Sequence, residues 1–132
     1  MSPAVEISKL DAREEEYLRN LLNYTEQHPE GWTLKPNSTH EYSHEDIRPI
    51  IQPIIQKDKK KILIRITGDS RNLRYYFDVG DLIPIAGERY TISDGQGKVK
   101  LELGEKGHIV QRVGVQVQEN CTLYLLWVVN MK

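Results

Sequence analysis

The second half of the chain alternates apolar and polar residues in short segments, and turn residues interrupt them about every ten positions. The alternation covers residues 62–66, 73–79 and 113–117, and Gly-containing turns follow the first two segments. A period of two is typical of strands that bury one face, and no segment after residue 59 repeats with the period of a helix. The pattern predicts a mainly β fold: an antiparallel β-sandwich, a jelly-roll-like sandwich or a barrel.

Two details refine this expectation. The turn Asp94-Gly95-Gln96-Gly97 separates residues 89–93 from residues 98–103, and Asp-Gly supplies the positive φ values of a tight turn, so these segments are predicted to form a hairpin. Residues 122–129 are apolar at nearly every position, which predicts a central strand covered on both faces. Cys121, the single cysteine, begins this run and is expected to be an inert buried thiol.

The first 30 residues are predicted to form one amphipathic helix, which begins near Ser8 or Asp11 and ends at the breaker His28-Pro29-Glu30-Gly31. Its apolar residues recur at helical spacing, and acidic residues fill its first turns, where the helix dipole favours them. These apolar residues are Leu10, Tyr17, Leu18, Leu21 and Leu22. The apolar face packs either on the chain's own domain or on a second copy or partner.

A length of 132 residues suits one globular unit, and we divide it into three segments. Residues 1–30 are the amphipathic helix, residues 31–58 a Pro- and Ile-rich connecting segment, and residues 59–132 the antiparallel β domain. Within the connecting segment, isoleucines at helical spacing conflict with Pro49 and Pro53. A short helix from Pro49 and an extended edge segment fit equally well.

The sequence His40-Glu41-Tyr42-Ser43-His44 matches H-E-x-x-H and resembles the zinc metallopeptidase motif. In that family the motif lies on a helix, so that both imidazoles bind zinc from one face and the Glu acts as base on a metal-bound water. The resemblance implies zinc as cofactor, His40 and His44 as ligands and Glu41 as catalytic base of a small zinc-dependent hydrolase. The alternative is a polar loop in which Ser43 caps a short helix.

Charge is unevenly distributed along the chain. Residues 57–74 contain seven basic and two acidic residues, whereas residues 1–30 contain seven acidic and three basic ones. Because Tyr75, Tyr76 and Phe77 follow the basic segment, one hypothesis is a module that binds single-stranded nucleic acid through cations and stacked rings. The simpler interpretation is that the acidic helix lies across the basic strand, within one chain or between two copies.

The overall composition restricts the classes of function. A net charge of −1 does not favour attraction to nucleic acid or anionic lipid by the field of the whole molecule. No apolar run is long enough to span a bilayer, and the first residues do not resemble a signal peptide, so we expect an intracellular location and no membrane partner.

These patterns favour a non-enzymatic protein-interaction or assembly module, which we expect to form a homo-oligomer because sheet edges and apolar helix faces are commonly covered by a second copy. The zinc hydrolase and the nucleic-acid module remain alternatives. The residues expected to contact the partner are apolar ones on the helix and basic ones in the β domain: Leu18, Leu21, Leu22, Lys59, Lys60 and Arg74.

Overall fold

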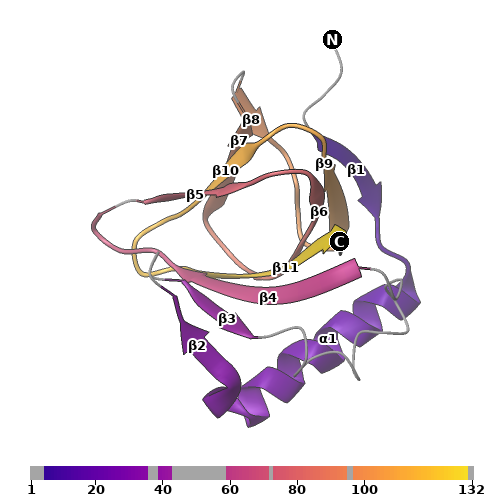
Figure 1. Cartoon of the computed structure of the whole chain (residues 1–132), viewed down its shortest axis with the longest axis vertical. Helices are drawn as coiled ribbons and strands as arrows, with labels where there is room; N and C mark the ends of the chain where they lie inside the picture. Colours follow the sequence, from indigo (N-terminus) through magenta and orange to yellow (C-terminus); the bar gives the residue numbers. More distant parts are fainter. Residues whose placement is uncertain (1–4, 36–38, 43–58, 72, 95–96, 131–132) are drawn as a thin grey trace.

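The computed structural model describes residues 5–35, 39–42, 59–71, 73–94 and 97–130, and for residues 59, 60 and 130 only the backbone (Figure 1). One α-helix and a series of strands make up this part of the chain. They are β1 (Val5–Lys9), α1 (Ala12–Gln27), β2 (Trp32–Leu34), β3 (His40–Tyr42), β4 (Lys59–Thr67), β5 (Arg74–Phe77), β6 (Gly80–Gly87), β7 (Tyr90–Asp94), β8 (Gly97–Val99), β9 (Glu105–Ile109), β10 (Val113–Val117) and β11 (Thr122–Asn130).

The described strands form two antiparallel sheets, and the mainly β sandwich expected from the alternation is confirmed. One sheet has seven strands in the order β1-β9-β6-β11-β4-β3-β2, and the other has four in the order β5-β10-β7-β8. Each sheet keeps its own two edges within the described residues, so the barrel alternative is wrong. Figure 1 shows the four-stranded sheet on one side of the seven-stranded sheet and α1 on the other.

β11 occupies the centre of the seven-stranded sheet, between β4 and β6. Leu123 and Leu125 lie in the core between the two sheets, whereas Leu126 and Val128 lie in the core under α1. Successive strand residues point to opposite faces, so a strand covered on both faces needs apolar residues at even and odd positions alike. The expectation of a central strand at residues 122–129 is confirmed.

α1 begins where its sequence provides a cap. The Asp11 side chain accepts a hydrogen bond from the Glu14 backbone N–H (2.8 Å), and the Glu14 side chain accepts one from the Asp11 N–H (3.1 Å), which completes a capping box. Leu18 and Leu21 are buried against Leu63 and other residues of the seven-stranded sheet. Of the two interpretations of the apolar face, the structure shows packing on the chain's own domain.

Several boundaries differ from the sequence prediction. Residues 5–9, the first part of the segment assigned to the helix, form β1 and pair with β9, itself not predicted as a strand. The connecting segment 31–58 contains β2 and β3, which extend the seven-stranded sheet beyond β4. The prediction of a short helix or an extended edge at Pro49 and Pro53 lies outside the described residues.

No helix in the described part of the chain is long and apolar enough to cross a membrane.

Pro84 lies in an internal strand, β6, where a missing N–H would normally break the ladder. The pairing with β11 shifts here: Tyr124 is opposite Ala86, and Leu125 is opposite Pro84. Ile85 is therefore the extra residue of a β-bulge, and bulges are where interior prolines are tolerated. Ile85 packs at the margin of the core under α1.

We expect Leu21→Ala to lower the free energy of unfolding by about 2–5 kcal/mol, because Leu21 is 0% exposed between α1 and the sheet. Urea unfolding followed by circular dichroism measures the change. Asn20→Ala, at an exposed position of the same helix, is the matched control and should stay within about 0.5 kcal/mol. Equal midpoints for the two variants would contradict the docking of α1.

Candidate functional site

β5 is an edge strand of the four-stranded sheet and carries the most exposed aromatic residue of the described chain. It pairs with β10 on one side, and within the described residues no strand pairs with its other side. Tyr75 and Phe77 point inward and pack with the core between the sheets. Arg74 and Tyr76 lie on the outer face, where Tyr76 is 60% exposed.

A glycine allows the outer side chains of β5 to lie flat across the neighbouring strand. Gly114 of β10 is directly opposite Tyr76. A Cβ atom on Gly114 would lie 2.5 Å from the Arg74 Cδ, closer than Cβ atoms approach other atoms, and 3.3 Å from the Tyr76 Cε1, a tight contact. The absence of a side chain at Gly114 is therefore what lets Arg74 and Tyr76 cover β10.

The carboxyl end of β5 carries an ion pair. Arg112 Nε donates a hydrogen bond to Asp78 Oδ1 at 2.8 Å, and its guanidinium also lies 5.9 Å from the centre of the Tyr76 ring. This hydrogen bond holds the pKa of the Asp78 carboxyl below its usual value. Asp78 is thus a carboxylate at neutral pH, with Arg74 at the opposite end of the same strand.

A groove opens beside β5, between the two sheets. Its volume is about 600 Å³. Apolar and aromatic side chains make up most of its lining: Ile62, Ile64, Tyr75, Phe77, Val79, Trp127 and Val129. Thr39, Glu41, Arg74 and Asp78 add polar groups. An edge strand beside an apolar groove can take up another extended strand by main-chain hydrogen bonds and side-chain burial.

The zinc motif does not adopt the geometry that its resemblance implies. His40, Glu41 and Tyr42 form strand β3 instead of a helix, because they pair with β2 and β4. His40 lies opposite Arg65, and Glu41 lies opposite Ile64, so the two side chains point to opposite faces of the sheet. The expected arrangement of a ligand and a base on one helix is therefore wrong for His40 and Glu41, and His44 lies outside the described residues.

Two further findings bear on the zinc hypothesis. The Lys35 Nζ lies 4.0 Å from the Glu41 Oε1, so the carboxylate that the motif assigns as base lies beside a lysine ammonium group. Within the described residues no group of three His, Cys, Asp or Glu side chains gathers closely enough to hold a metal ion.

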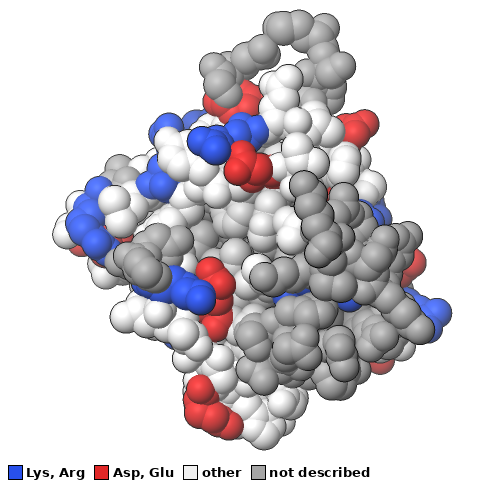
Figure 2. Space-filling view, in the orientation of Figure 1, with Lys and Arg blue, Asp and Glu red and all other residues white. Residues whose placement is uncertain are grey.

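The basic segment 57–74 does not form one surface in the described structure. Lys61 is buried, Arg65 lies 4.6 Å from the Trp32 ring centre, and Arg71 pairs with Asp69 at 2.6 Å. Arg74 alone among these reaches the outer face of the four-stranded sheet. On the face shown in Figure 2, basic and acidic residues are interspersed. These described basic residues therefore form no continuous cationic surface along which a nucleic-acid backbone could lie. The nucleic-acid hypothesis stays a prediction.

The expected partner residues divide into four groups. Leu18 and Leu21 are buried in their own domain, and Leu18 also lines a cavity under α1. Leu22 is half-buried and lines a cavity under α1. Lys59 and Lys60 belong to β4, but their side chains lie outside the described structure, which leaves Arg74 as the exposed member of the set.

The sequence analysis named Arg74 as a partner-contacting residue and the three aromatic residues after it as rings for nucleic acid, but it did not predict that this segment is the edge of a sheet. The signal that could have indicated an edge strand is the run Arg74-Tyr75-Tyr76-Phe77-Asp78, which has opposite charges at its ends and aromatic residues between them.

Comparison with known protein families matches no family, and comparison with the curated proteins finds no relative.

His40 should titrate below the ordinary pKa of 6.5, first because burial disfavours the charged imidazole and second because Arg65 lies nearby. Since the folded-state pKa is lowered, the contribution of His40 to stability is complete above pH 6.5 and is lost as the pH falls from there through the folded-state pKa. An NMR titration of the His40 ring measures this pKa. Arg65→Gln should raise it only in part, and a wild-type pKa at or above 6.5 would contradict the structure.

Proposed function

We propose that the chain is a non-enzymatic assembly module that binds a second copy of itself through the edge of β5. The observation that carries the proposal is the self-complementary sequence Arg74-Tyr75-Tyr76-Phe77-Asp78 on a strand with no described partner on its outer side. Edge strands are natural templates for pairing with another chain. Two-fold symmetry then requires the same strand to meet itself in antiparallel orientation.

The alternation of faces restricts the register of such a pair. For the two copies to keep their inner faces on the same side, outer residues must lie opposite outer residues. Centring the pair on Tyr76 meets this condition. In this register Arg74 lies opposite the partner's Asp78, and Tyr75 lies opposite the partner's Phe77. Tyr76 lies opposite the partner's Tyr76. A shift by one residue would place inner aromatic residues opposite outer charges.

The energetics predict a weak, concentration-dependent dimer. Each cross-strand pair contributes roughly 0.2–1 kcal/mol, and the symmetric register contains two Arg–Asp pairs. A five-residue edge buries less than the roughly 1,200 Å² of a standard stable interface. Burial of apolar groove residues beside β5 adds to the association. We therefore place the assembly among transient homodimers.

Reciprocal charge exchange tests this register. Arg74→Glu alone and Asp78→Arg alone each place like charges opposite one another, so each should raise the dimer dissociation constant by about fivefold or more. The double variant Arg74→Glu/Asp78→Arg restores opposite charges across the two-fold axis. It should dimerise several-fold more tightly than Asp78→Arg alone, which has lost the same Arg112–Asp78 ion pair. Sedimentation velocity over a wide concentration series measures all four proteins.

Lys98→Glu is the matched control, because Lys98 is an exposed cation on β8, the strand at the opposite edge of the same sheet. It should leave the dissociation constant unchanged. The proposal is wrong if the wild-type protein is monomeric throughout the series. It is equally wrong if the Arg74→Glu variant dimerises as well as the wild type, or if the double variant is no tighter than Asp78→Arg, which has lost the same pair with Arg112.

A further inference from the structure

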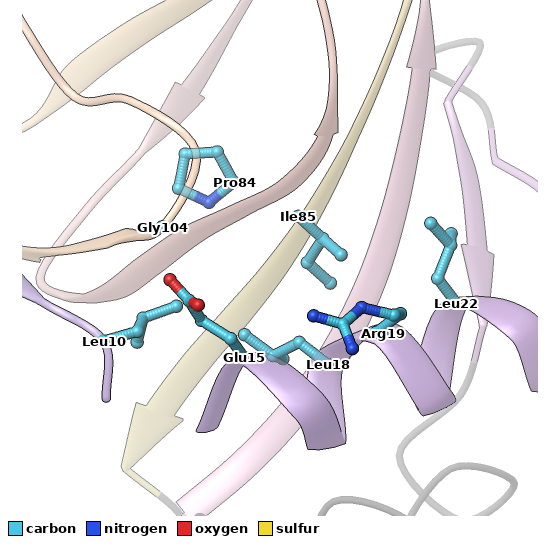
Figure 3. Close-up of a pocket in the computed structure, with 8 residues that line it drawn as sticks. All are labelled: Leu10, Glu15, Leu18, Arg19, Leu22, Pro84, Ile85 and Gly104. Carbon is cyan, nitrogen blue, oxygen red and sulfur yellow. The ribbon is translucent and has the colours of Figure 1, made fainter. Parts of the chain in front are cut away.

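A second cavity lies on the other side of the seven-stranded sheet, between α1 and β6 (Figure 3). Its volume is about 200 Å³. About half of the lining is aliphatic, from the helix and its approach (Leu10, Leu18, Leu22) and from the bulge of β6 (Pro84, Ile85), and the rest is polar. This volume equals that of roughly six or seven water molecules in the liquid. The cavity therefore suits a ligand much smaller than a drug molecule.

Backbone features outside the helix shape this cavity. The β-bulge places Ile85 on the side of the sheet that faces α1. Gly104 closes one end, with a φ of +87° that side chains rarely adopt, and its carbonyl accepts a hydrogen bond from the Leu10 N–H at 2.9 Å. A Cβ atom on Gly104 would lie 3.2 Å from a carboxylate oxygen of Glu15. The glycine therefore leaves room for the carboxylate at the cavity.

Two opposite charges flank the aliphatic lining. Glu15 and Arg19 lie one helical turn apart, an arrangement that normally favours an ion pair on the helix surface. Within the described residues no such pair forms between them. Figure 3 shows the Glu15 carboxylate directed toward Gly104 and Pro84, while the Arg19 guanidinium is seen below Ile85, away from that carboxylate. The cavity thus presents an anion and a cation separately.

We infer that this cavity binds a small aliphatic zwitterion of the branched-chain α-amino acid class. Arg19 offers the planar donors that bind a carboxylate, and Glu15 accepts hydrogen bonds from an ammonium group. The branched side chain of the ligand enters the space among Leu18, Leu22 and Ile85, where it is removed from water. Glu15 and Arg19 are both exposed and therefore hydrated in the free protein. A ligand with only one charge would make one of the two charged contacts and gain less on binding.

Three related compounds test this chemistry. L-Leucine is the probe, 4-methylpentanoate lacks its ammonium group, and 3-methylbutylamine lacks its carboxylate. Titration of the ¹⁵N-labelled full chain should shift the amide signals of α1 and β6 with L-leucine. Each analogue should bind about tenfold more weakly, because it loses one charged hydrogen-bonding group. Analogues that bind as well as L-leucine, or the absence of shifts with L-leucine, would overturn the inference.

Variants locate the site. Glu15→Gln and Arg19→Gln should each weaken L-leucine binding about tenfold, and Leu22→Trp should abolish it by filling the cavity. Glu16→Gln, at an exposed neighbouring position that does not line the cavity, is the matched control and should bind normally. Equal loss in the control and the Glu15 variant would overturn the assignment. The same titration on the Arg74→Glu protein separates this site from the β5 edge, since the two share no residue.

Discussion

The burial of β11 on both faces is the interaction on which the remaining structure depends. Its side chains alternate between the core shared with the four-stranded sheet and the core under α1. Leu123, Leu125 and Leu126 are each 0% exposed, so neither layer can be removed without exposing apolar surface of the same strand. At roughly 1.5–3 kcal/mol for each fully buried large apolar side chain, this single strand contributes to the stability of three layers at once.

Local patterns in the sequence were sufficient to predict the elements that depend on local chemistry. Asp11, one of the two starts expected for the helix, is the N-cap of α1, and the uninterrupted apolar run marks β11. Elements defined by distant partners were missed. β1 and β9 owe their structure to each other although about 100 residues separate them, and β3 becomes a strand because β4 offers it an edge. The hydrophobic period of a segment indicates whether it can form a strand, but not which other strand it will pair with.

The H-E-x-x-H match shows why spacing alone does not define a site. On a helix, residues four positions apart share a face, whereas on a strand adjacent residues point to opposite faces. Pairing of β3 with β4 directs His40 toward Arg65 and Glu41 toward the groove beside β5. The same residues therefore acquire unrelated environments. At β5 the sequence indicated the residues, Arg74 and the aromatic run after it, but not their position at an edge, because an edge is a property of the sheet order and not of the strand.

Both candidate sites follow from the unequal widths of the two sheets. Four strands cannot cover seven, so the inter-sheet core ends at β5 and leaves a groove beside Trp127, while the opposite face of the large sheet requires α1 as a separate cover. A single helix meets the bulged strand β6 imperfectly, and the cavity at Ile85 is the result. Because β11 separates the two sites, with Trp127 on one face and Leu126 on the other, substitutions at one site should not disturb the other, and the proposed assembly and the proposed ligand binding can be tested independently.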